Sequence, residues 1–167
     1  MERVTKTGKG RKTMSDISVV DGKKIRYWNL KKNEWKYELA DAYSCMVPVF
    51  PDKYCCYPVV DEFVSLTPQG LLCFRESYCW DGPSGPTIDT PSSMRGALKH
   101  DGLYQLMRAG VLDIKWREAT DKVLRDTCKE DGMWGWRADW WYRAVRLAAG
   151  PAAKKGHDVA EDIETAP

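Results

Sequence analysis

The chain has 167 residues, 43% of them hydrophobic and 30% charged, which fits one globular domain large enough to bury a core. The formal net charge of only +2 provides no global field that would attract nucleic acid, so no specific nucleic-acid partner is expected. No apolar run approaches the ~18 residues of a membrane span, and residues 1–6 lack the apolar stretch of a signal peptide, so we expect synthesis in the cytoplasm and no transmembrane segment.

The two ends of the chain differ in composition from its middle. Residues 1–16 are rich in Lys, Gly and Thr without periodicity and predict a flexible basic arm. Such an arm could touch phosphates or an acidic protein, although a solvated tail is the preferred interpretation. Residues 151–167 predict a disordered tail that is acidic toward its end. Residues 17–150 are therefore expected to form a single domain.

Residues 17–80 predict a β-rich half. Short runs that are typical of strands lie at residues 25–30, 35–39, 43–50 and 54–60. The first two flank the polar turn at 31–34 and predict a hairpin. Prolines in the later runs favour edge or irregular strands. Residues 71–75 and 77–80 flank Glu76 and predict either a tight hairpin or one bulged strand.

The six cysteines bear on the redox state of the protein. They lie at positions 45, 55, 56, 73, 79 and 128. None forms a C-x₂-C pair, and no histidine stands at zinc-ligand spacing, so a structural zinc site is not expected. Most lie in strand-like runs, which favours buried thiols, while the even count leaves disulfides open for a protein outside the cell.

Residues 81–150 predict a helical half. Three helices are expected, at about residues 94–109, 114–130 and 136–149. Ser92 or Ser93 can cap the first helix, and Asp113 can cap the second. The predicted fold class is therefore α+β, with a small antiparallel β-rich half packed on a C-terminal three-helix half.

A candidate catalytic group lies on the first two helices. His100 and Tyr104 are four residues apart and share a helix face. With its ordinary pKa of about 6.5, the histidine suits general-base catalysis on water. Asp121 on the second, antiparallel helix would face His100, fix its tautomer and accept a hydrogen bond from Tyr104. The same residues could also form a purely structural network.

Asp101 is a candidate cation ligand. It is rotated about 100° from His100 and points to an adjacent edge of the helix. Hard cations such as Ca²⁺ bind carboxylate and carbonyl oxygens. The Pro/Gly loop at residues 80–85, upstream of this helix, could supply carbonyls, with Trp80, Gly82 and Ser84 as candidate metal ligands beside Asp101. Such a cation could polarise an ester carbonyl, although loops of this composition are usually only turns.

The beginning of the third helix is crowded with aromatic residues, namely Trp134, Trp136, Trp140, Trp141 and Tyr142. Packing against the rest of the domain is the preferred interpretation, and a lipid-interface or partner surface is the alternative. Arg137, Arg143 and Arg146 would suit anionic headgroups or a protein partner in the second case.

The order of these motifs resembles a family of small phage and prophage proteins catalogued as a domain of unknown function. The matching motifs are a D-G-x-S-x-P loop at 81–86, an A-x-x-H-D-x-L-Y helix at 97–104, an A-D pair at 120–121 and a W/Y-x-x-V-R helix within 141–146. Position 120 is threonine here instead of alanine. The resemblance covers roughly residues 35–150.

The same order is similar to the phospholipase A2 superfamily, whose members share a glycine-containing calcium loop, an H-D-x-x-Y helix and an aspartate on the next antiparallel helix. The resemblance implies that His100 is the general base and that Tyr104 and Asp121 support it. It also implies that Asp101 binds Ca²⁺ together with carbonyls of the loop at 80–85.

These resemblances predict a phage-type protein, associated with the particle or with lysis, that carries a calcium-assisted acyl-ester hydrolase site. Other phage structural proteins or host envelope lipid are the expected partners, with synthesis in the host cytoplasm and incorporation into the virion as the expected location. The alternative is a non-catalytic virion structural or accessory protein that retains the helical scaffold. A binder of a host protein through the Trp-rich helix is a third, less supported hypothesis.

Overall fold

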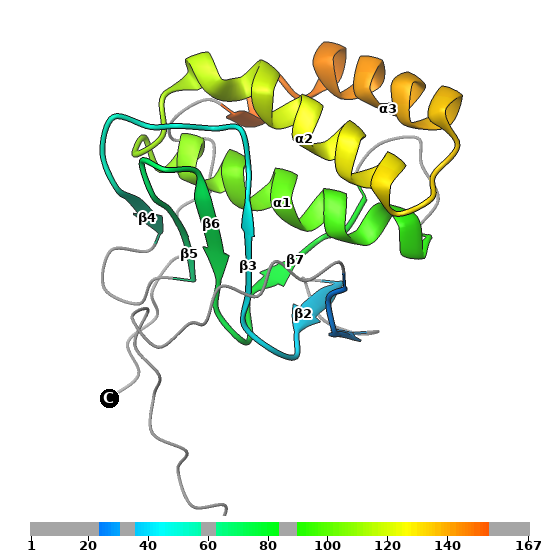
Figure 1. Cartoon of the computed structure of the whole chain (residues 1–167), viewed down its shortest axis with the longest axis horizontal. Coiled ribbons are helices and arrows are strands. Elements are labelled where there is room, and N and C mark those ends of the chain that lie inside the picture. The colour runs from blue at the N-terminus through cyan, green and yellow to red at the C-terminus, as the bar shows by residue number, and fades with distance from the viewer. Residues whose placement is uncertain (1–23, 31–35, 58–62, 84–89, 154–167) are drawn as a thin grey trace, which may run out of the picture.

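The structure is a computed structural model that describes residues 24–30, 36–57, 63–83 and 90–153. The predicted arm at 1–16 lies outside these ranges, as does the predicted tail from residue 154 onward. Antiparallel strands in the N-terminal half and three α-helices after them confirm the predicted α+β class (Figure 1).

The described strands form two small antiparallel sheets. Their bounds are β1 Tyr27–Asn29, β2 Tyr37–Leu39, β3 Tyr43–Met46, β4 Cys55–Tyr57, β5 Val64–Leu66, β6 Leu71–Phe74 and β7 Cys79–Trp80. One sheet has the order β1-β2-β7 and the other β3-β6-β5-β4. The predicted hairpin is confirmed, because β1 and β2 pair with Tyr27 opposite Leu39.

The expected hairpin or bulged strand across Glu76 is wrong, because β6 and β7 belong to different sheets. Ser77 has a φ of 68°, so the chain turns sharply after β6. The backbone N–H of Ser77 then donates to the carbonyl of Leu39 at 2.9 Å, which directs the chain to β2. The pattern also gave no sign of β5, whose three residues are too short for a recognisable alternation.

The helical half follows the predicted order. Its elements are α1 Pro91–Arg108, the 3₁₀ turn η2 Ile114–Trp116, α2 Arg117–Glu130, α3 Gly135–Ala148 and the 3₁₀ turn η3 Pro151–Ala153. The N-cap of α1 is Thr90 and not Ser92 or Ser93, and the Ser93 hydroxyl accepts a hydrogen bond of 3.0 Å from the Thr90 N–H. Asp113 caps the 3₁₀ turn η2 and not the second helix itself, whose N-cap is Trp116.

The ordered domain extends slightly beyond the predicted boundary at residue 150. The tail was expected to begin at residue 151, but Ala153 at the end of η3 is only 1% exposed. This alanine packs within the main hydrophobic cluster. The start of the predicted tail therefore belongs to the folded domain.

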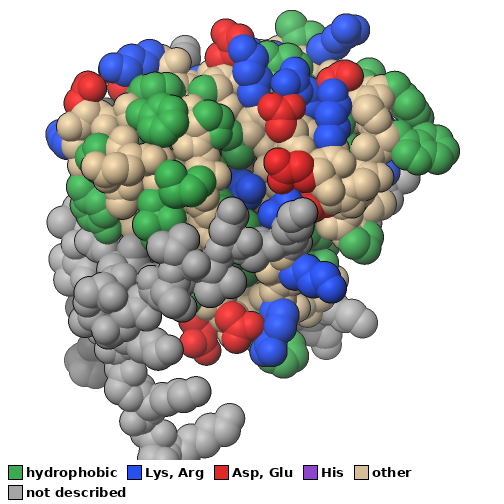
Figure 2. Space-filling model, viewed as in Figure 1, with side chains coloured by type: hydrophobic (Ala, Val, Ile, Leu, Met, Phe, Trp, Pro, Cys, Tyr) green, Lys and Arg blue, Asp and Glu red, His purple; other side chains and the backbone are tan. Residues whose placement is uncertain are grey.

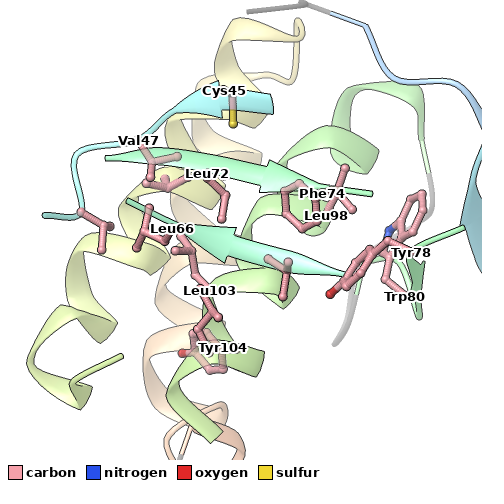
Figure 3. Packing of buried hydrophobic residues seen from close by; sticks show 14 of the residues in the cluster. Cys45, Val47, Leu66, Leu72, Phe74, Tyr78, Trp80, Leu98, Leu103 and Tyr104 are labelled. Atoms are coloured by element: carbon pink, nitrogen blue, oxygen red, sulfur yellow. The ribbon is translucent and has the colours of Figure 1, made fainter. Parts of the chain in front are cut away.

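Helix α1 is the central element, packed between the larger sheet and α2 (Figure 1). Figure 3 shows Leu66 and Leu72 of the sheet in one cluster with Leu98 and Leu103 of α1. Two glycines allow α1 to approach the sheet on one side and α2 on the other. A Cβ on Gly102 would lie 2.4 Å from the Phe74 ring, and a Cβ on Gly96 would lie 2.6 Å from Sγ of Cys128 on α2.

All six cysteines are described, and none of them forms a disulfide. Four are buried, as expected for thiols that act as small core residues, while Cys56 and Cys79 are partly exposed. Burial raises the pKa of Cys73 to about 11 and that of Cys128 to about 12, so both remain protonated thiols at neutral pH. Among the described helices, none is both long and apolar enough to cross a membrane.

Candidate functional site

The carboxylate of Asp121 on α2 is the centre of a buried polar network. Its Oδ1 atom lies 3.0 Å from Nε2 of His100 and accepts a hydrogen bond of 2.8 Å from the hydroxyl of Tyr104. Asp121 is fully buried, while His100 is 8% and Tyr104 2% exposed. The structure thus brings together the three residues that the sequence grouped as catalytic candidates. Their catalytic roles stay predictions.

The geometry of this group follows from the antiparallel packing of α1 and α2. His100 and Tyr104 lie one turn apart on α1, and their ring centroids are 4.1 Å apart. Lys99, the residue before His100, donates to the Thr127 hydroxyl. Residues later on α1 therefore contact residues earlier on α2, because the two helices are antiparallel. Both rings therefore reach the same carboxylate near the beginning of α2.

Two arginines complete the network, and the prediction of the site did not include them. Arg146 on α3 donates to Oδ2 of Asp121 at 2.9 Å. Arg117 on α2 donates to the Tyr104 hydroxyl at 3.1 Å, and its Nε lies 3.9 Å from the same Oδ2. Arg117 also donates to the backbone carbonyls of Val145 and Arg146. The Asp121 carboxylate therefore connects all three helices.

The sequence contains a feature that points to each of these two arginines. Arg117 precedes Asp121 by four residues, which is ion-pair spacing on a helix. Arg146 occupies the arginine position of the W/Y-x-x-V-R motif. Its charge was interpreted as suited to headgroups or a protein partner, whereas the structure pairs it with Asp121.

A mainly apolar cavity of ≈530 Å³ adjoins the network. Its walls come from the end of β7 and the residues after it, from one face of α1, and from the second half of α3. His100, Asp101 and Tyr104 line it, as do Trp80 and Gly82 from the predicted cation loop. Ser84, the remaining predicted ligand, lies outside the described residues. A volume of this size suits a small-molecule ligand or an acyl chain.

The charges in the network set the protonation of its members. Burial lowers the pKa of His100, but hydrogen bonds with Asp101 and Asp121 and their negative charges raise it more, so the net shift is upward. Burial raises the pKa of Asp121, but hydrogen bonds from His100 and Arg146 lower it by more. The net shift is downward, so this carboxylate stays ionised. Burial and the charge of Asp121 raise the pKa of Tyr104, which keeps its hydroxyl as a donor.

Asp101 is placed differently from Asp121. Its side chain is 24% exposed, and its Oδ1 lies 3.5 Å from Nδ1 of His100, on the opposite side of the ring from Asp121. Burial raises the pKa of Asp101 and the nearby charge of Asp81 adds to this, while His100 and Arg108 lower it. Asp101 and Asp81 thus place two carboxylates beside one cavity.

Carboxylate oxygens are of the donor type that hard cations such as Ca²⁺ prefer. No group of three or more His, Cys, Asp and Glu side chains within the described ranges is arranged to hold a metal ion. Asp101 and Asp81 would therefore need carbonyls of the segment after β7, where Gly82 adopts a φ of 75° that other residues rarely adopt.

No family model matches the chain, and neither a curated protein nor a solved structure matches it significantly.

Proposed function

We propose that the protein is a metal-assisted acyl-ester hydrolase in which His100 acts as the general base on water. One observation carries this proposal. His100 binds a buried, ionised aspartate through Nε2 at 3.0 Å and also lines a mainly apolar cavity. A histidine with one ring nitrogen held by a carboxylate can use the other nitrogen as a general base.

The tautomer of His100 follows from the ionised state of Asp121. An ionised Asp121 can only accept, so the neutral imidazole carries its proton on Nε2. Its lone pair is then on Nδ1, which in this state no longer donates to Asp101. Nδ1 would take a proton from water while the water oxygen bonds to the ester carbonyl carbon. The proton then passes to the departing alcohol oxygen as the carbon–oxygen bond breaks, which leaves a carboxylic acid and an alcohol. Asp121 stabilises the transient imidazolium and stays ionised throughout.

The remaining residues have supporting roles in this proposal. Tyr104 fixes the orientation of the Asp121 carboxylate through its 2.8 Å hydrogen bond. The apolar walls favour an acyl chain as the bound part of the substrate. Asp101 and Asp81, with carbonyls of Trp80 and Gly82, would hold a Ca²⁺ ion. Such an ion supplies Lewis-acid polarisation of the ester carbonyl.

The biological setting is proposed from the motif order. The resemblance to small phage proteins supports a particle-associated or lysis-associated protein that acts on lipid of the host envelope. The second candidate, a non-catalytic virion component, is favoured by a different observation. Asp121 is bound by side chains from both α1 and α3. The same arrangement is expected in a protein that uses this carboxylate only to hold its helices together.

Hydrolysis of a series of acyl esters, with and without Ca²⁺, tests the proposal. His100→Gln should reduce kcat/KM by about 10²- to 10⁴-fold, the usual contribution of a general base. Substitution of the other histidine, His157→Gln, is the matched control and should leave the rate unchanged. Full activity of His100→Gln, or a wild-type chain that cleaves none of the esters, would favour the structural candidate.

A further inference from the structure

The outward face of α3 carries an exposed apolar stripe. Trp136, Trp140 and Leu147 are 67%, 47% and 87% exposed. Their spacing of four and seven residues places them on one face of the helix. Trp134, just before the helix, is 72% exposed, and its ring centroid lies 6.2 Å from that of Trp136. Figure 2 shows hydrophobic side chains projecting at the right-hand edge of the molecule, where α3 begins.

The charges on this face are cationic. Arg143 lies between Trp140 and Leu147 on the stripe and is exposed. The one acidic residue of α3, Asp139, accepts a hydrogen bond of 2.7 Å from Lys129, which offsets its charge. Exposed indoles combined with an arginine are typical of helices that lie at the interface of a bilayer, where indoles occupy the headgroup region and arginines meet phosphates.

The cavity lies beside the same helix. Ala144 and Ala148 of α3 line the cavity, and Ala148 is exposed, so the cavity reaches solvent beside this helix. Ala144 follows Trp140 by four residues and is therefore its neighbour on the helix surface. A surface that covers Trp140 and Leu147 would consequently lie close to the edge of the cavity.

We propose that this stripe docks the protein onto a phospholipid bilayer. The choice of lipid over a protein partner rests on the proposed function, because an acyl-ester substrate would then enter the cavity from the docked surface. The indoles of Trp136 and Trp140 insert at the headgroup level, and Arg143 contacts lipid phosphates. Docking requires none of the residues that bind Asp121, so it can be tested apart from hydrolysis.

Sedimentation of the full chain with large vesicles tests the docking. Two compositions are used, phosphatidylcholine alone and an equimolar mixture with phosphatidylglycerol. The double variant Trp136→Ser with Trp140→Ser should weaken binding to both by at least about tenfold. Arg143→Gln should weaken binding mainly to the anionic vesicles. Trp28→Ser is the matched control, because Trp28 is 63% exposed but lies on β1, away from α3 (Figure 1).

Two further measurements separate docking from catalysis. His100→Gln should bind vesicles like the wild type, and the double Trp variant should still hydrolyse a soluble short-chain ester. Vesicle binding without any hydrolysis would support docking while the proposed function failed. The docking would be overturned if the wild-type protein bound neither kind of vesicle, or if Trp28→Ser weakened vesicle binding as much as the double Trp variant. A dimer in light scattering that the double variant abolishes would overturn it in favour of a second copy.

Discussion

Arg146 donates a hydrogen bond of 2.9 Å to Oδ2 of Asp121, which brings the third helix to a carboxylate whose other partners lie on α1 and α2. The backbone carbonyl of Arg146 in turn accepts a hydrogen bond of 2.7 Å from Arg117. The second half of α3 forms one wall of the cavity. The charge pair therefore positions both the orienting aspartate and part of the surface that would face a substrate.

Replacement of Arg146 by methionine should destabilise the fold. The variant keeps most of the apolar stem but leaves a fully buried carboxylate with one cation fewer, so the free energy of unfolding should fall by about 1–3 kcal/mol. Urea denaturation measures this loss. Arg143→Met is the control, since that side chain is exposed, and it should change stability by no more than about 0.5 kcal/mol. Equal losses in both variants would show that the pair with Asp121 contributes nothing specific.

Gly96→Ala should separate the two helices that hold His100 and Asp121. The added Cβ would lie 2.6 Å from Sγ of Cys128 and 3.0 Å from the carbonyl oxygen of Leu124, and a backbone carbonyl yields little. Overpacking of this kind costs about 1–3 kcal/mol, which exceeds the gain of up to about 1 kcal/mol in helix propensity. Thermal or urea unfolding measures the difference. Gly135→Ala at the start of α3, with no atom within 4 Å, should be neutral or slightly stabilising.

The raised pKa of His100 gives stability and catalysis opposite pH dependences. Its folded pKa lies above the ordinary value of 6.5, so its contribution to stability is complete below that pH and is lost as pH rises through the folded pKa. Wild type should therefore lose stability relative to His100→Gln as the pH rises above 6.5 and through the folded pKa. Hydrolysis should increase over the same interval, because the base must be neutral. Denaturation at several pH values and a rate profile check the two trends. A rate that falls as His100 deprotonates would exclude it as the base.

The cation proposed at Asp101 can be detected without any activity assay. Tb³⁺ substitutes for Ca²⁺ and luminesces when an indole nearby absorbs light, and Trp80 lines the same cavity as Asp101. Wild type should give a luminescence signal that Ca²⁺ displaces, and Asp101→Asn should reduce Tb³⁺ affinity by at least about tenfold. Asp126→Asn is the matched control, because Asp126 is an exposed carboxylate on α2. An identical titration for Asp101→Asn would remove this residue as a ligand.

The sequence located the helical half well because its signals are local. Helix spacing placed His100 and Tyr104 on one face, and the short connection to α2 implied that Asp121 would face them. The N-cap was displaced to Thr90, since Pro91 fits the first helical position, where an N–H is not needed. The β half was harder to predict, because its strands are two to four residues long and their pairing depends on distant segments.

By itself the sequence determined the α+β class, the three helices and the choice of His100, Tyr104 and Asp121, because periodicity and spacing are properties of neighbouring residues. Tertiary structure alone decided that β7 pairs with β2, that Arg146 turns inward to Asp121, and that the cavity lies between β7, α1 and α3. Such features depend on how separate elements pack. The sequence alone does not distinguish an arginine whose guanidinium reaches solvent from one whose guanidinium binds a buried carboxylate.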